Sequence, residues 1–147
     1  MNRISIKTLE PKAYEAMLGL ERYLRESPLK KPHIELIKIR ASQINGCAFC
    51  LGMHTYDARK AGETEQRIYA LNAWEESPLY TEEERAILAL TDAVTLIADT
   101  RLPDEVYAKV AAVLDEHYLA AAIMAIVTIN AWNRIAISTR MVWQDPQ

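Results

Sequence analysis

Helix start and stop signals divide almost the whole sequence into runs of helical periodicity. Its six prolines and four glycines stand mostly between these runs, and few segments alternate in the way that strands do. Thr81 and Glu84 form a capping box, in which a Thr cap is followed three residues later by Glu. Asn45 and Gly46 form a strong stop, because both tolerate the left-handed conformation that ends helices. The sequence therefore predicts an all-α fold.

The helix start and stop signals predict about six to seven helices in one domain. A length of 147 residues suits a single domain, so residues 1–147 are expected to fold together. The final helix is rich in alanine, which permits close contact in the core or between subunits. The predicted helices are Pro11 to Glu26, His33 to Ile44, Cys47 to Ala61, Glu65 to Trp74, Thr81 to Ala98, a helix beginning near Pro103, and Ala120 to Arg140.

Charge and hydropathy limit the kinds of partner and the cellular compartment that we expect for this protein. The formal net charge is -3 and both signs are mixed along the chain, without the basic stripe that nucleic-acid binding requires. The N-terminus has no apolar run of signal-peptide length. The most apolar stretch, Leu119 to Ile129, is too short to span a bilayer. We therefore expect a cytoplasmic protein that binds neither nucleic acid nor membranes.

The two cysteines, Cys47 and Cys50, are three residues apart. In a reducing cytosol such a pair is usually metal-binding or redox-active. On one helix the two sulfurs lie on neighbouring turns, and His54 follows Cys50 by four residues on the same face. A thiolate is the attacking species, and a helix N-terminus, a nearby base or a CxxC context lowers a thiol pKa to roughly 3.5–7.5.

Spacing assigns the two sulfurs different roles. Cys50 is one turn from His54, which is close enough to accept its proton, whereas Cys47 is two turns away. Cys50 is therefore expected to be the nucleophile. Cys47 is expected to be the resolving thiol, which condenses with the sulfenic acid formed on Cys50 to give a disulfide.

Glu35 precedes Cys47 by twelve residues. If the chain folds back at Asn45 and Gly46, Glu35 lies about 15 Å and His54 about 10 Å from the tip of the hairpin. A carboxylate there could orient the imidazole and accept its proton. Lys38 follows Glu35 by three residues on the helix surface, so an ion pair between these two residues is the competing possibility.

The pattern Glu35-x11-Cys47-x2-Cys50-x3-His54 resembles the AhpD-like alkylhydroperoxidases of the carboxymuconolactone decarboxylase superfamily. The resemblance implies that the glutamate, both cysteines and the histidine form a proton relay and a redox pair, with the second cysteine attacking the peroxide. One position departs from the pattern, because Phe49 stands where the best-known peroxidase members carry a second histidine.

The resemblance also implies an all-helical fold built around a helical hairpin, and a homo-oligomer, often a trimer or hexamer. It implies no bound cofactor. Instead, an external dithiol such as a lipoyl-bearing protein would reduce the Cys47–Cys50 disulfide. The expected function is thiol-dependent reduction of alkyl hydroperoxides or hydrogen peroxide in antioxidant defence.

Four other interpretations of the site stay open. The protein could be a general disulfide reductase or redox sensor with weak peroxidase activity. It could be a decarboxylase-like member of the superfamily, although decarboxylation of a lactone needs no thiol couple. Cys47, Cys50, His54 and Glu35 could also bind zinc, or the chain could be a non-catalytic oligomeric scaffold.

Three groups of residues outside the motif are expected to be structural. His33 and His117 are expected at the surface. Asn130, Asn133 and Arg134 interrupt an apolar helix, which indicates hydrogen bonds between helices or between subunits. The three tryptophans are expected to pack in the core or an interface, or to line a pocket beside the thiols.

Overall fold

The computed structural model describes residues 1–146, and within that range it contains helices and no strand. The all-α prediction is confirmed. The short helices α1 and α7 were not anticipated, because a single helical turn leaves little periodicity to detect. The helices are α1 (Ile6–Leu9), α2 (Pro11–Glu26), α3 (Lys31–Asn45), α4 (Ala48–Lys60), α5 (Glu65–Ala70), a 3₁₀ helix (Leu71–Ala73), α6 (Glu82–Thr95), α7 (Ile97–Thr100), α8 (Asp104–Ala111) and α9 (Glu116–Thr139).

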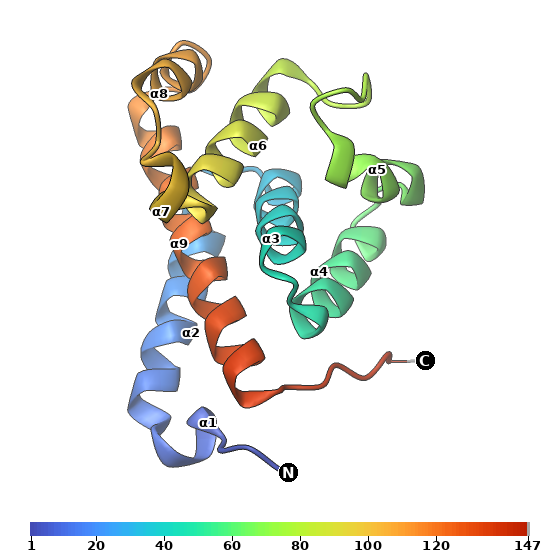
Figure 1. The fold of residues 1–147 in the computed structure, drawn as a ribbon, viewed down its shortest axis with the longest axis vertical. Coiled ribbons are helices and arrows are strands. Elements are labelled where there is room, and N and C mark those ends of the chain that lie inside the picture. The colour runs from blue at the N-terminus through green and yellow to red at the C-terminus, as the bar shows by residue number, and fades with distance from the viewer. Residues whose placement is uncertain (147) are drawn as a thin grey trace.

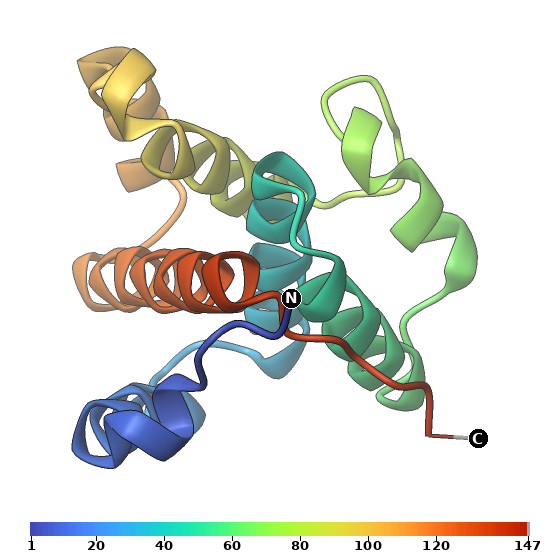
Figure 2. The ribbon, with the colours of Figure 1, turned by 60° about the horizontal axis from the view of Figure 1, so that its bottom comes forward.

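Helix α3 lies at the centre of the fold, in contact with α4, α6 and α9 (Figures 1 and 2). Ile34 and Ile37 belong to a large apolar cluster shared with α6 and α9. Leu36 and Ile39 belong to a second cluster, which includes residues of α4, α6 and the 3₁₀ helix. Because α3 is buried on two sides, its polar residues are held in fixed surroundings.

The connection between α3 and α4 is a tight turn at Gly46. This glycine adopts φ 70°, in the left-handed region that favours glycine. The amide of Cys47 donates to the carbonyl of Ser42, which closes the end of α3. Cys47 is extended and begins α4 as its N-cap. The predicted stop at Asn45 and Gly46 thus produces the helical hairpin (Figure 1).

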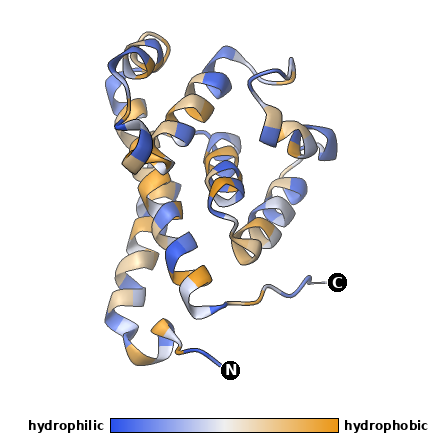
Figure 3. Cartoon of the chain, in the orientation of Figure 1, coloured by the Kyte–Doolittle hydropathy of each residue, from blue (hydrophilic) through white to orange (hydrophobic). Residues whose placement is uncertain are grey.

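Helix α9 is the longest helix of the described part of the chain, and it is long and apolar enough to cross a membrane. In the fold it packs along α3, α6 and α2. Ala121, Ala122 and Ala125 are buried in the core. Figure 3 shows apolar residues alternating with polar ones along it. Its apolar composition is thus explained largely by the core that it helps to form.

The prediction for His33 is wrong, whereas His117 is exposed as expected. His33 is buried in the first turn of α3. Its Nδ1 lies 2.6 Å from the hydroxyl of Tyr118, at the start of α9. The docking of α9 against α3 therefore covers a residue that the preceding proline had suggested would lie at an exposed helix start.

Candidate functional site

The turn at Gly46 places both cysteines at the N-terminus of α4. They form a disulfide with a Cα–Cα distance of 5.4 Å. The sulfur of Cys47 also accepts a hydrogen bond of 3.3 Å from the amide of Cys50. Amide groups at a helix N-terminus favour negative charge. A thiolate formed here is therefore stabilised by the backbone before any side chain acts on it.

Cys50 and His54 line a cavity of about 650 Å³, whereas Cys47 does not. Both cysteines are only 1% exposed. A small molecule therefore approaches the pair from the side of Cys50. This asymmetry is consistent with the predicted roles, in which Cys50 attacks the substrate and Cys47 then forms the disulfide.

His54 contacts Glu35 directly. Its Nδ1 lies 3.2 Å from Oε2 of Glu35, and both side chains are almost entirely buried. A histidine that donates from Nδ1 to a carboxylate keeps the lone pair of Nε2 for accepting a proton. The fold thus brings together the four residues that sequence reasoning selected, although their catalytic roles stay a prediction.

The competing ion pair between Lys38 and Glu35 does not form. Lys38 instead pairs with Glu21 of α2, with Nζ 2.6 Å from Oε2. The other oxygen of Glu21 accepts a hydrogen bond of 3.0 Å from the indole of Trp132. Sequence reasoning missed Glu21, because nothing in a surface-like run of α2 indicates that its partners come from two other helices.

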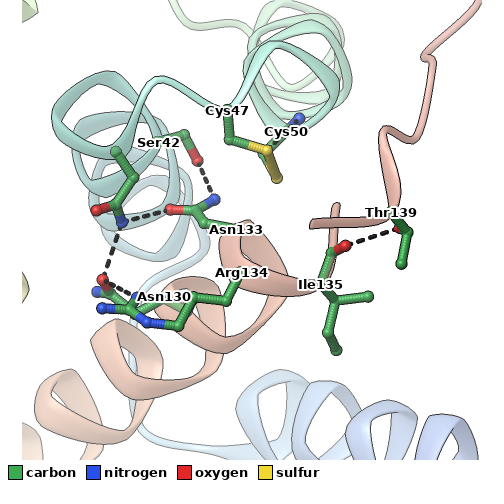
Figure 4. Close-up of a disulfide and its surroundings, with 9 residues drawn as sticks. Ser42, Cys47, Cys50, Asn130, Asn133, Arg134, Ile135 and Thr139 are labelled. Atoms are coloured by element: carbon green, nitrogen blue, oxygen red, sulfur yellow. Dashed lines mark hydrogen bonds between the residues drawn. A yellow bond between two sulfur atoms is a disulfide. The ribbon is translucent and has the colours of Figure 1, made fainter. Parts of the chain in front are cut away.

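A network of amide side chains supports the hairpin from below (Figure 4). Asn133 is fully buried and donates to Ser42 Oγ at 3.0 Å. Asn45 donates to Asn133 and to Asn130, both at 2.9 Å. The interruption of apolar α9 by asparagines is therefore explained by hydrogen bonds between helices. These bonds fix the end of α3, and with it the turn that presents Cys47.

The wall of the cavity comes mostly from apolar side chains of α2, α3, α4 and α9. Trp132 and Phe49 contribute aromatic surface, and Met141 contributes from the segment after α9. Trp143, two residues further on, packs against Gly52 of α4. The C-terminal segment therefore forms part of the surroundings of the cysteines, which no local sequence pattern indicated.

Among the residues that the structure describes, no group of three or more His, Cys, Asp or Glu side chains is arranged to hold a metal ion. The two sulfurs are joined to each other, and His54 is engaged with Glu35. The geometry therefore gives no support to the zinc interpretation.

Comparison with known proteins places this geometry in a family. Residues 11–93, which include the four motif residues, match the carboxymuconolactone decarboxylase family. The chain belongs to the carboxymuconolactone decarboxylase family. The matched region covers α2 to most of α6, so the family pattern contains the whole hairpin.

Two relatives match nearly the whole chain. The uncharacterised protein YdfG of Bacillus subtilis is 48% identical over 136 residues, or 92% of each chain. A crystal structure from Agrobacterium tumefaciens is 43% identical and covers 99% of each chain with a TM-score of 0.95. That protein is of unknown function and has been assigned provisionally to antioxidant defence as an AhpD protein.

A more distant structure shares the fold alone. The debrominase Bmp8 is 20% identical, with a TM-score of 0.82 over 91% of this chain and 72% of that one. The AhpD-like arrangement of helices therefore occurs in proteins of different activity, and the activity of this chain has to be argued from its own site.

Proposed function

We propose that this protein is a thiol peroxidase that uses Cys50 to attack hydroperoxides and Cys47 to resolve the product. One observation carries the proposal. Cys50 shares a cavity with the His54–Glu35 pair, while Cys47 lies within disulfide distance but away from that cavity. Cys50 can then react with a peroxide in the cavity, and Cys47 can form the disulfide from outside it, without rearrangement of the helices.

The chemistry balances in three steps. The Cys50 thiolate attacks the terminal oxygen of ROOH, the O–O bond breaks, and the products are a sulfenic acid and RO⁻, which takes a proton to leave as ROH. The thiol of Cys47 then attacks the sulfur of the sulfenic acid, and water leaves as the disulfide forms. An external dithiol finally reduces this disulfide and becomes a disulfide itself.

His54 transfers the protons of this cycle, and Glu35 assists it. His54 lies one helical turn from Cys50 and takes the thiol proton, and the carboxylate of Glu35 orients the ring and stabilises its charged form. The protonated imidazole can then supply the proton that the leaving alkoxide needs. Phe49 leaves this relay with a single histidine.

The cavity favours an organic hydroperoxide over hydrogen peroxide. Its volume of about 650 Å³ lies within the range of roughly 300–1,000 Å³ that holds drug-sized ligands. Apolar walls bind a hydrocarbon group, and hydrogen peroxide has none. We therefore expect cumene hydroperoxide to oxidise the reduced protein faster than hydrogen peroxide does at equal concentration.

The proposal extends to partners and compartment. No resident cofactor is needed, because a dithiol such as a lipoyl group on another protein would close the cycle in the cytoplasm. A homo-oligomer, trimer or hexamer, is also proposed. Its support is the exposed apolar surface of α9, where Val127 and Ile137 are each 44% exposed. Sedimentation analysis of the purified protein tests the subunit count.

The test of function measures thiols and products together. Reduced protein is mixed with one equivalent of cumene hydroperoxide, and mass spectrometry follows the loss of two thiols and the gain of a Cys47–Cys50 disulfide. Cys50→Ser should abolish peroxide consumption, whereas Cys47→Ser should leave a sulfenic acid that dimedone traps. The reverse pattern would exchange the two roles, and the absence of oxidation in the unmodified protein would contradict the proposal.

A disulfide reductase or redox sensor is the second candidate, favoured by the presence of Phe49 in place of a histidine. Such a protein would exchange its disulfide rapidly with dihydrolipoamide yet react slowly with every hydroperoxide. Turnover with the dithiol, measured with and without cumene hydroperoxide, separates the two functions.

A further inference from the structure

Glu21 and Lys38 form a buried ion pair beside the relay. Their side chains are 19% and 7% exposed, and the two charged groups are 2.6 Å apart. Trp132 holds the second carboxylate oxygen. A carboxylate from α2 is thus fixed by an indole from α9 and an ammonium group from α3, and all three residues line the cavity that contains Cys50.

Lys38 has a second carboxylate on its own helix. Glu35 precedes it by three residues on α3, which places the two side chains on the same helix face. Both line the cavity. Glu35 is already in use, because its Oε2 lies 3.2 Å from Nδ1 of His54. An ammonium group on Glu35 would compete with the imidazole for the same carboxylate.

Burial forces the choice between these two carboxylates. An ammonium group that is removed from water needs a counter-charge or hydrogen-bond acceptors, because an unpaired buried charge is strongly destabilising. Lys38 is 6% exposed, so its ammonium group has little contact with bulk water. If Glu21 lost its charge, Glu35, on the same face of α3, would offer a compensating charge.

We infer that Glu21 is a positioning residue that holds Lys38 away from Glu35 and so keeps Glu35 available to His54. The inference rests on the proposed function for its biological meaning, since it concerns the same relay. It assigns a mechanistic purpose to an ion pair that lies outside the CxxC motif.

Six charged or titratable side chains line the cavity besides Cys50, His54 and Glu35. They are Tyr14, Glu21, Arg25, Lys31, Lys38 and Asp57. Of the cations, only Lys38 is buried, and Arg25 and Lys31 can remain in water. Lys38 is therefore the one cation of this set whose pairing must change when Glu21 is neutralised.

The test uses Glu21→Gln, alone and combined with Lys38→Met. Glutamine keeps the size of the side chain and an acceptor for Trp132, but it removes the charge. The readout is the rate at which iodoacetamide alkylates Cys50 in the fully reduced protein, followed by mass spectrometry from pH 5 to 9. Glu15→Gln is the matched control, since Glu15 lies on the same helix in an exposed pair with Arg22.

We expect E21Q to alkylate roughly tenfold more slowly at neutral pH, since a positioned base contributes about 10²–10⁴-fold and only part of it is lost. E21Q/K38M should recover the wild-type rate and pH profile, because no ammonium group remains to occupy Glu35. Glu15→Gln should match the wild type. A crystal structure of E21Q should show Lys38 Nζ within salt-bridge distance of Glu35.

Two results would overturn the inference. One is an E21Q variant that reacts like the wild type, and the other is a double variant that stays as slow as E21Q. If E21Q does not fold, a double variant that reacts more slowly than the wild type overturns the inference, because it contains no ammonium group that could occupy Glu35. Alkylation needs no peroxide, so recovery in the double variant alongside absent peroxide reduction would refute the proposed function and leave the inference standing.

Discussion

At residue 33, burial favours the neutral imidazole. Tyr118 Oη accepts a hydrogen bond of 3.0 Å from the amide of Lys30 and lies 2.6 Å from Nδ1 of His33. When the neutral imidazole carries its proton on Nε2, Nδ1 accepts the proton of the tyrosine hydroxyl. Burial, reinforced by the nearby charge of Lys30, lowers the pKa of His33, and the weaker influence of Glu83 and Glu84 does not reverse this.

Stability should therefore fall as the solution is acidified from pH 7.5 to 5.5. The unfolded chain binds a proton at its ordinary histidine pKa near 6.5, while the folded chain resists it, so the unfolding free energy rises with pH across this window. Urea unfolding at several pH values measures the slope. His33→Gln should flatten it, and an unchanged slope in that variant would contradict the argument. Above pH 5.5, protonation of Glu83 and Glu84 contributes little, because the pKa of each lies below 4.5.

At the scale of elements, Trp143 holds the segment after α9 against the cysteine helix. A Cβ built on Gly52 would collide with the ring of Trp143, and real side chains do not tolerate such a contact. Glycine is otherwise unfavourable inside a helix, by roughly 1 kcal/mol relative to alanine. Its presence in α4 is explained by the indole that rests on it.

Gly52→Ala should therefore release Trp143 while leaving α4 helical. Because Met141 of the same segment lines the cavity, Cys50 should become more accessible, and its alkylation in the reduced protein should accelerate. Tryptophan fluorescence and proteolysis after residue 140 report the release. Gly19→Ala is the control, since a Cβ there meets only Arg22 at an ordinary 3.5 Å. Equal behaviour of the two variants would show that Trp143 does not anchor the segment.

The contact between α3 and α9 depends on Asn133 in a similar way. Replacement by leucine keeps the branched shape with somewhat larger methyl groups, but it leaves Ser42 without its donor and removes one of the two acceptors of Asn45. Unpaired buried polar groups cost about 1–3 kcal/mol. Asn133→Leu should lower the unfolding free energy in urea by that amount. A loss well below this range would mean that water or neighbouring groups replace the network.

Across the whole molecule, local features were predictable and tertiary ones were not. The capping box at Thr81 and Glu84 and the turn at Gly46 are confirmed, because capping and left-handed turns depend on adjacent residues. The contact between Glu35 and His54 followed from one helical hairpin. The contacts of Glu21 with Lys38, of Tyr118 with His33 and of Trp143 with Gly52 depend on how helices dock, which no periodicity encodes.

The disulfide is also a local feature of the fold. Cys47 and Cys50 enclose a loop of few residues at one helix end. In the chain-entropy account, a disulfide around a 15-residue loop contributes about 3 kcal/mol, and a shorter loop contributes less. Both cysteines belong to the larger apolar cluster, whose other members come mostly from α3, α6 and α9, and the smaller cluster contains neither cysteine. A redox cycle needs a core held together by other residues as well, because the fold must persist in both states.

The reduced protein should therefore unfold cooperatively in urea, with a free energy that is lower than that of the oxidised protein by less than roughly 3 kcal/mol. Unfolding followed by circular dichroism, with and without a phosphine reductant, measures the difference. Cys47→Ser/Cys50→Ser, which cannot form the bond, should match the reduced protein and be indifferent to the reductant. Loss of the fold on reduction would identify the pair as a structural staple, and a catalytic cycle through the dithiol would then be untenable.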